Sequence, residues 1–291
     1  MGTLDGLLVV SLEQAVAAPF VSSRLADAGA RVIKIERVEG DFARNYDDVV
    51  QGHSAYFVWL NRGKESIAMD LRQPSELRLL KSMLVKSDIL IENFKTGSLQ
   101  KIGLDLTEIR KENPKLITCS ISGYGSHGKW AEMKAYDLLI QAETAIASLT
   151  GSADEPGRVG VSIADIAAGM YSHSAVLEAL IARGINGYGR HIEVSLFDAL
   201  ADWITVPLLL IDYGSKTPER LRLAHPSICP YEAFKTSDGK IILLSIQNER
   251  EWKRFCTVIL KDSDFYLKFP DNLTRVKNRK DVDTFVGQVF G

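Results

Sequence analysis

Short apolar runs alternate with helix-like segments along the first half of the chain, and this alternation limits the possible folds more than any other feature. Residues 7–12 form a continuous apolar run, Pro19 begins a helical segment that Gly29 ends, and residues 32–36 form a second apolar run. Together they make one β-α-β unit of about thirty residues.

The pattern repeats farther along the chain. Strand-like residues 67–71, 89–91 and 116–121 are separated by helical segments at 74–86 and 106–111. Apolar strands that alternate with helices predict an α/β fold, in which a Rossmann-like parallel sheet carries helices on both faces.

The second half of the chain begins with a long helix and then changes in character. Residues 162–183 predict a helix that stops at Gly184, residues 191–194 a strand, and residues 196–211 another apolar helix. After a polar break, residues 231–245 contain a hairpin signal at Thr236-Ser237-Asp238-Gly239, and Asn248 begins a further helix. We predict a large α/β domain over residues 1–213, a linker over 214–224 and a smaller α+β domain over 225–291.

The charge and cysteine content exclude several classes of protein. The 291 residues carry a net charge of -2 with scattered Lys and Arg, which gives no electrostatic basis for binding nucleic acid. No apolar segment reaches membrane-spanning length, and no basic stretch precedes an apolar run at the N-terminus. Cys119, Cys229 and Cys256 are too few and too far apart for a disulfide framework. We therefore expect a cytoplasmic protein with no membrane or nucleic-acid partner.

A dinucleotide-binding enzyme is the first function that a Rossmann-like layout suggests. Glu36, at the end of the second strand, stands where such enzymes keep the acid that binds ribose. However, residues 13–19, which follow the first strand, contain no glycine, whereas a phosphate-binding loop there requires several. The sequence therefore disfavours nicotinamide and flavin binding.

Asp165 lies where an apolar loop turns into the long predicted helix. If Ser162 is the N-cap, Asp165 is the third helical residue, and a hydroxyl three residues before an acid resembles a capping box. Small residues such as Ala164 and Ala167 flank the acid, so that a ligand has room to approach its backbone. The positive end of the helix dipole also favours an ionised, nucleophilic carboxylate. Spacing alone leaves both interpretations open, a structural cap and a nucleophile.

Seven groups of short motifs, spread over nearly the whole chain, occur in one order. They are Ala17-Ala18-Pro19 with residues 25–37; Asn61-Arg62-Gly63-Lys64-Glu65-Ser66-Ile67; Glu92-Asn93-Phe94; Ser122-Gly123-Tyr124-Gly125; Ala135-Tyr136-Asp137; the segment around Asp165; and Gly189-Arg190-His191-Ile192-Glu193-Val194. In this order they resemble the class III CoA-transferase family, the CaiB/BaiF-type enzymes that include the formyl-CoA transferases.

The resemblance implies a role for Asp165, which stands where the family has its nucleophilic aspartate. The carboxylate is expected to attack the thioester of an acyl-CoA and to become an aspartyl-CoA thioester, from which an acceptor acid takes the CoA. Covalent catalysis of this kind divides one transfer into easier steps. The expected partners are an acyl-CoA and a small carboxylic acid, with coenzyme A as co-substrate and with no metal or organic cofactor.

The resemblance also implies a set of residues that bind CoA. They are Ala15, Val16, Ala17, Arg37, Met69, Arg72, Asn93, Phe94, Lys101, Lys134 and Tyr136. Each has a structural alternative, because a lone surface Arg or Lys is usually only solvated and Asn93-Phe94 also fits a plain turn.

Three positions predict which branch of the family the chain resembles and which acid accepts the CoA. Acyl-CoA racemases of the family have a histidine where this chain has Tyr136, so we expect CoA transfer and not racemisation. The segments around His225 and Gln247 resemble those of enzymes that take CoA from succinyl-CoA to C4 to C6 dicarboxylates such as itaconate or mesaconate. His225 and Gln247 are therefore predicted to bind the substrate, although a buried structural histidine is an equal alternative for His225.

Family members are longer than this chain and form interlocked homodimers. The chain stops at Gly291, inside a predicted helix that begins near Asp281. We therefore expect a C-terminally truncated relative that forms a homodimer. A CoA-binding protein without turnover is the alternative.

Overall fold

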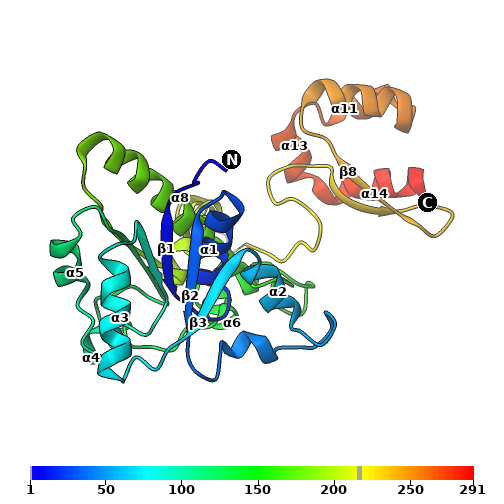
Figure 1. The fold of residues 1–291 in the computed structure, drawn as a ribbon. Coiled ribbons are helices and arrows are strands. Elements are labelled where there is room, and N and C mark those ends of the chain that lie inside the picture. Colours follow the sequence, from blue (N-terminus) through cyan, green and yellow to red (C-terminus); the bar gives the residue numbers. More distant parts are fainter. Residues whose placement is uncertain (1, 215–217) are drawn as a thin grey trace. The chain divides into compact units, whose positions relative to one another are not determined.

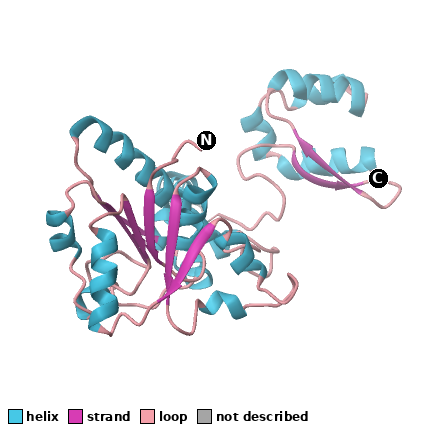
Figure 2. Cartoon of the chain, viewed as in Figure 1, coloured by secondary structure: helices cyan, strands magenta, loops and turns pink. Residues whose placement is uncertain are grey.

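The computed structural model describes residues 2–214 and 218–291 (Figures 1 and 2). These residues form two compact units: one within Met1–Ala147 and Arg158–Leu208, the other within Ser148–Gly157 and Leu209–Gly291. Residues 215–217, in the predicted linker 214–224, lie outside the described residues.

A six-stranded sheet forms the centre of the first unit. Its strands are β1 (Leu8–Leu12), β2 (Arg31–Glu36), β3 (Lys64–Ala68), β4 (Ile89–Glu92), β5 (Ile117–Ser122) and β6 (His191–Ser195). The order across the sheet is β3-β2-β1-β4-β5-β6, and all neighbours are parallel. This is the strand order of a Rossmann sheet, so the predicted fold class is confirmed.

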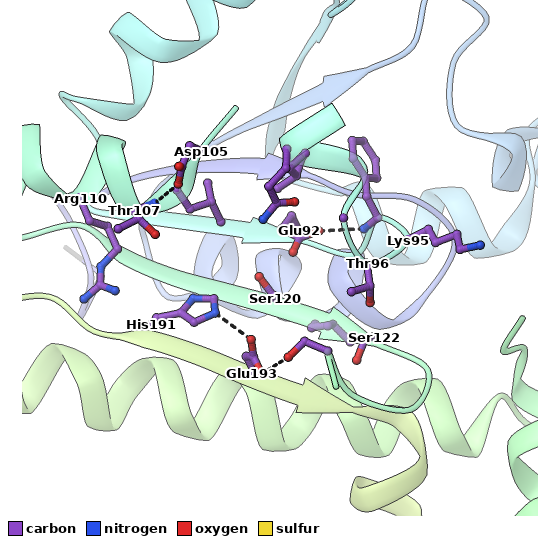
Figure 3. Close-up of a pocket in the computed structure, with 17 residues that line it drawn as sticks. Glu92, Lys95, Thr96, Asp105, Thr107, Arg110, Ser120, Ser122, His191 and Glu193 are labelled. Atoms are coloured by element: carbon purple, nitrogen blue, oxygen red, sulfur yellow. Dashed lines mark hydrogen bonds and ion pairs between the residues drawn. The ribbon is translucent and has the colours of Figure 1, made fainter. Parts of the chain in front are cut away.

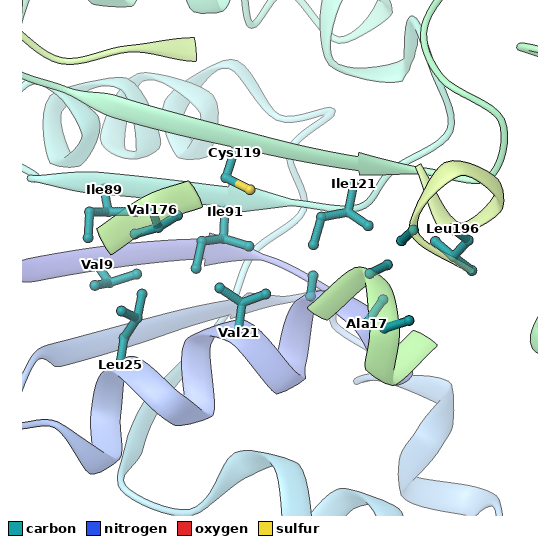
Figure 4. Close-up of a cluster of buried hydrophobic side chains, with 14 of the residues drawn as sticks. Val9, Ala17, Val21, Leu25, Ile89, Ile91, Cys119, Ile121, Val176 and Leu196 are labelled. Carbon is teal, nitrogen blue, oxygen red and sulfur yellow. The ribbon is translucent and has the colours of Figure 1, made fainter. Parts of the chain in front are cut away.

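Alternation along each strand divides the core of this unit between the two faces of the sheet. Val9 faces a cluster formed with α1 (Ala17–Asp27) and α8 (Ile163–Asn186), which Figure 4 shows. Val10, the next residue, faces a second cluster formed with α3 (Pro74–Leu84) and α5 (Leu106–Glu112). Helices cover both faces, as the near-continuous apolar runs predicted.

The remaining helices of residues 2–214 are short, and two of them include residues of both units. They are the 3-10 helices η1 (Phe42–Asn45) and η2 (Asp202–Ile204) and the α-helices α2 (Ala55–Asn61), α4 (Ser98–Lys101), α6 (Asp137–Glu143), α7 (Ile146–Leu149), α9 (Leu196–Ala201) and α10 (Thr205–Gly214).

Two predicted helix ends were wrong. Helix α1 begins at Ala17, two residues before Pro19, because proline is tolerated anywhere in a first turn, where amide donors lack helical partners. Helix α8 continues through Gly184 and ends at Gly187, whose φ of 84° supplies the left-handed cap.

Helices α1 and α8 pack closely at their N-terminal ends. A Cβ atom built on Gly169 would stand 2.8 Å from Phe20 Cδ1 and 3.1 Å from the carbonyl oxygen of Ala17. Ala164, Ala167 and Ala168 are fully buried on the same helix. Small side chains therefore let the first two turns of α8 lie directly against the first turn of α1.

The second unit is the predicted α+β arrangement. Strands β7 (Tyr231–Lys235) and β8 (Ile241–Ser245) form an antiparallel hairpin. The helices are α11 (Glu249–Phe255), the π-helix η3 (Cys256–Leu260), α12 (Ser263–Lys268), α13 (Asn272–Lys277) and α14 (Arg279–Phe290). Trp252 is fully buried at the centre of this unit, and its indole N–H donates to the carbonyl oxygen of Phe269 at 2.7 Å.

Within the described residues, no helix combines the length and the apolar character needed to cross a membrane. Cys119, Cys229 and Cys256 are all buried free thiols.

Candidate active site

A pocket of about 600 Å³ lies where the loops that follow β1, β4 and β5 meet the first turn of α8. Gln14 and Ala15 come from the first loop, Asn93 and Phe94 from the second, and Gly123 from the third. The sheet order reverses direction between β1 and β4, and open α/β sheets bind ligands at the carboxyl ends of their strands at such a point. Asp165 is part of the lining, and we call this cavity the Asp165 pocket.

The side chain of Asp165 is half-buried and lies against the loop that leads into α1. Its carboxylate accepts a hydrogen bond from the backbone N–H of Ala17, the first residue of α1. That amide has no partner within its own helix, so the contact satisfies a donor that the helix leaves open.

The capping box expected at Ser162 does not form. Ser162 is the N-cap residue of α8, but its hydroxyl accepts no bond from the helix and lies 3.3 Å from the hydroxyl of Tyr56. Asp137 of α6 takes over this role, because its Oδ1 atom accepts from the backbone N–H of Ala164 at 2.9 Å. Asp165 is therefore not needed to cap its own helix.

The environment of Asp165 raises its pKa to about 7. Burial is the largest cause and the nearby carboxylate of Asp137 the second, while the hydrogen bond from Ala17 acts in the opposite direction. The helix dipole was expected to favour the ionised form of this acid, but the net effect of its surroundings is a raised pKa. About half of the molecules carry the ionised form at neutral pH.

Three aromatic side chains that the sequence analysis did not identify form one wall of the pocket. They are Phe42, Tyr46 and Tyr56, and the rings of Tyr46 and Tyr56 meet edge to face with centroids 5.7 Å apart. Burial, followed by the charges of Asp41 and Asp165, raises the pKa of Tyr46 to about 12, so its hydroxyl remains a proton donor. The only signal in the sequence is the aromatic content of residues 42–59, which an ordinary core would also explain.

Most of the predicted site residues lie around this pocket. Besides Asp165, the lining includes Ala15, Val16, Ala17, Asn93, Phe94, Lys134 and Tyr136. Asn93 is engaged with the loop after β1, because its Oδ1 atom accepts from the Gln14 amide at 3.0 Å and its Nδ2 atom donates to the Gln14 carbonyl at 2.9 Å. The amide of Asn93 therefore shapes the wall, and direct contact with a ligand stays a prediction.

Four predicted CoA-binding residues lie outside the lining. Arg37 does not line the pocket, but it donates a hydrogen bond at 3.3 Å to the side chain of Gln14, which does. Met69 is buried in the hydrophobic cluster formed with α3 and α5. Arg72 is exposed and paired with Asp70 at 2.8 Å. Lys101 is exposed at the end of α4. Their roles toward CoA stay predictions.

His225 and Gln247 belong to the second unit. The His225 ring stacks on Tyr231 with centroids 5.3 Å apart, and its Nδ1 atom accepts from the Ser227 amide at 3.1 Å. Gln247 donates to the hydroxyl of Ser245 at 2.7 Å. Their predicted role in binding substrate is not tested by these contacts.

Two charged residues of the lining were also missed. Arg158 lies 3.7 Å from Asp137 Oδ2, and Lys95 follows Phe94 directly in the chain. Nothing in the sequence distinguishes either of them from an ordinary surface cation.

Glu36, the candidate ribose-binding acid of a dinucleotide enzyme, has a structural role. Burial by itself raises its pKa, but hydrogen bonds from Arg44, Ser66 and the amide of Asp41 bring the pKa down to about 2. With its oxygens committed in this way, Glu36 is not available to a ligand.

A second, smaller cavity of about 190 Å³ lies next to the Asp165 pocket (Figure 3). The two share five lining residues: Phe94, Lys95, Thr96, Ile121 and Ser122. Its polar groups are largely paired with one another: His191 lies 3.2 Å from Glu193, and Glu193 accepts from Ser126 at 2.7 Å. Across residues 2–214 and 218–291, no group of three or more His, Cys, Asp or Glu side chains is arranged to hold a metal ion.

Comparisons with known proteins identify relatives of this chain. The chain is 36% identical to the succinate–glutarate CoA-transferase of Agrobacterium fabrum over 96% of its own length and 72% of the relative's. It is 38% identical to the acetyl-CoA:oxalate CoA-transferase of Acetobacter aceti over 89% of its own length and 67% of the relative's. A crystal structure of a CaiB/BaiF family protein from Brucella suis superposes with a TM-score of 0.83 at 38% identity, covering 99% of this chain and 78% of that one.

The sequence model of one family, described as CoA-transferase family III, matches residues 4–291. The chain spans about two thirds to three quarters of the length of the two CoA-transferases named above. Because this match covers nearly every residue, the chain belongs to CoA-transferase family III.

Proposed function

We propose that the protein transfers CoA from an acyl-CoA donor, succinyl-CoA in particular, to a small dicarboxylic acid through a covalent intermediate on Asp165. The observation that carries the proposal is the position of Asp165. It is a half-buried carboxylate in the wall of a pocket of about 600 Å³, held by a backbone amide and free of a capping role.

The chemistry begins with attack of the Asp165 carboxylate on the thioester carbonyl of the donor. The C–S bond breaks, which gives a mixed anhydride and the CoA thiolate. The thiolate then attacks the aspartyl carbonyl, the anhydride C–O bond breaks, and the donor acid leaves behind an aspartyl-CoA thioester. The acceptor carboxylate reverses these steps and departs as its CoA ester, restoring the Asp165 carboxylate.

The pKa of about 7 suits this nucleophile. A more basic carboxylate attacks more readily, and at neutral pH about half of the molecules are ionised. The amide of Ala17 already donates to the carboxylate, so it is well placed to stabilise the oxyanion that forms when the aspartyl carbon becomes tetrahedral.

The acceptor class rests on the relatives and on charge. The two relatives compared above are named for glutarate and oxalate, both of which are dicarboxylates. A dicarboxylate has one carboxylate to be activated and a second that must be held. We assign the second to His225 and Gln247 by family resemblance, while Arg158 supplies a cation in the lining of the Asp165 pocket itself.

Racemisation by the same fold is the competing chemistry. It requires a base beside the α-carbon of the acyl group, and histidine is the usual choice. Among the described residues that line the Asp165 pocket there is no histidine. The lining includes Tyr136, which by family resemblance stands where the racemases have their histidine. This favours transfer.

The deciding experiment separates an enzyme from a CoA-binding protein without turnover. The intact protein is incubated with succinyl-CoA, and its mass is measured under denaturing conditions. A covalent CoA adduct that hydroxylamine removes, and that the Asp165→Asn variant does not form, is the expected result. A protein that binds CoA but never carries an adduct would overturn the proposal. We also infer that the protein is cytoplasmic and forms a homodimer, and sedimentation of the same sample tests the dimer.

A further inference from the structure

Four charged side chains are buried side by side behind the loop that follows β1. Lys34 Nζ lies 2.8 Å from Asp41 Oδ2, and Lys64 Nζ lies 2.7 Å from Glu13 Oε1. All four side chains are at most 2% exposed. Burying two cations and two acids has a large desolvation cost, and apolar side chains of similar size generally give equal stability. The arrangement therefore calls for a role other than stability.

Asp41 connects this cluster to the backbone of the loop. While Oδ2 pairs with Lys34, its Oδ1 atom accepts from the amide of Ala15 at 3.1 Å and from the amide of Ala43 at 3.0 Å. Ala15 has a φ of 60°, a left-handed conformation that is unfavourable for alanine and persists only where neighbouring groups impose it. Asp41 is one such group.

The neighbours of Ala15 are held as well. Gln14 is bound through both of its backbone groups by Asn93, and the carboxylate of Glu13 is shared by Lys64 and the hydroxyl of Ser22. The loop is thus fixed at three successive residues, and the helix that it leads into presents the Ala17 amide to Asp165.

We propose that Asp41, oriented by Lys34, is a positioning residue for Asp165, because it holds the turn at Ala15 so that the Ala17 amide meets the Asp165 carboxylate. Asp41 acts through the backbone and does not itself reach Asp165. The inference deepens the proposed function and rests on it only for the importance of Asp165, so its test observes Asp165 directly.

The test compares double variants from which both buried charges are absent. Lys34→Met with Asp41→Asn keeps an oxygen that can accept from Ala15, whereas Lys34→Met with Asp41→Leu removes it at similar volume. Lys34→Met with Asp41→Thr is a milder third variant: threonine still caps η1, but its hydroxyl is one bond too short for the Ala15 amide. The threonine variant serves if the leucine variant does not fold.

The measurement is the titration of Asp165 without substrate. Aspartate labelled with ¹³C at Cγ is incorporated, and the Asp165 resonance is identified by its loss in Asp165→Asn. The other titratable groups near this carboxylate include Asp137 of α6, its N-cap residue Tyr136, Tyr46 after η1 and Tyr56 of α2, with Arg158 beside Asp137. Four more titratable residues line the same pocket: Asp47, Lys95, Glu132 and Lys134. None of these is changed in the variants.

Losing the Ala17 hydrogen bond removes an interaction that favours the ionised form. The Asp165 midpoint should therefore lie roughly half a unit to one unit higher in the leucine and threonine variants than in the asparagine variant. In the same variants, kcat for CoA exchange should fall roughly tenfold, with the KM for acyl-CoA changed by less than about twofold.

Equal midpoints in all three variants would overturn the positioning role, even if activity were lost. The expected shift of the Asp165 midpoint could also be found in a protein that never exchanges CoA. That result would support the positioning role and overturn the proposed function. The two ideas therefore fail separately.

Discussion

Asp137 Oδ1 accepts a hydrogen bond from the backbone N–H of Ala164 at 2.9 Å, so a carboxylate from α6 caps the helix that carries Asp165. The same carboxylate raises the pKa of Asp165. Asp137 also accepts from Gln141 at 2.8 Å and lies 3.7 Å from Arg158. One residue thus links the structure of the helix start to the protonation of the proposed nucleophile.

The first prediction follows from this link. Asp137→Asn keeps an oxygen for the Ala164 amide but removes the negative charge beside Asp165. Since a like charge disfavours ionisation, its removal should lower the Asp165 pKa by roughly one unit. The pH at which kcat/KM for CoA exchange is half-maximal should move down by the same amount. A profile that stays in place or moves up would show that the two carboxylates do not interact.

Asp165→Asn should abolish CoA exchange while leaving the fold intact. The amide of asparagine cannot form the anhydride or the thioester, so we expect a loss of at least roughly a thousandfold. Circular dichroism checks the fold, and Asp48→Asn, a change to an exposed acid outside the pocket lining, is the matched control. Exchange within roughly tenfold of the parent, a barrier change of only about 1.4 kcal/mol, would eliminate Asp165 as the nucleophile.

The raised pKa of Asp165 also predicts how stability depends on pH. Below its unfolded-state pKa near 4, Asp165 is neutral in both states and its burial has no electrostatic cost. As the pH rises toward the folded-state pKa of about 7, the unfolded state gains by ionising, and the folded protein loses stability relative to Asp165→Asn. Above pH 7 the variant should be more stable by roughly 2 to 4 kcal/mol, with little difference at pH 4. Urea unfolding at pH 4 and pH 8 measures both values, and a difference that does not grow with pH would contradict the buried environment.

The absence of a histidine from the described lining of the Asp165 pocket predicts the reaction class. With a 2-methylacyl-CoA in deuterated water, the protein should incorporate no α-deuterium while CoA exchange proceeds. Mass spectrometry of the recovered thioester gives the result. Label that enters as fast as CoA is transferred would identify a racemase.

The acceptor assignment predicts a selective effect of one substitution. His225→Ala should weaken the use of itaconate, mesaconate or succinate by roughly ten- to a hundredfold, because a hydrogen bond to the distal carboxylate is lost. A monocarboxylate of similar length should be affected much less and provides the internal control. Equal losses for both acceptors, or faster turnover of the monocarboxylate formate than of any diacid, would be incompatible with this role.

The fold was largely predictable because its signals are local. The apolar runs of β1, β2, β4 and β5 and the hairpin of β7 and β8 are each carried by a few consecutive residues. Buried parallel strands are apolar on both faces, so each can be recognised in the sequence as a nearly continuous apolar run. The errors came at helix ends such as Pro19 and Gly184, where either of two positions satisfies the local chemistry.

The sequence by itself determined the order of the strands and helices and the family resemblance, and it identified Asp165 as the candidate nucleophile. The tertiary structure decided what Asp165 is: its burial, its pKa, its contact with the Ala17 amide and its release from capping by Asp137. It likewise brought Asp41 to Ala15, 26 positions apart in the chain. Electrostatics and hydrogen bonds depend on distances in space, and the packing of α1 and of α6 against α8 sets those distances. Sequence spacing reports only what lies within a turn or two.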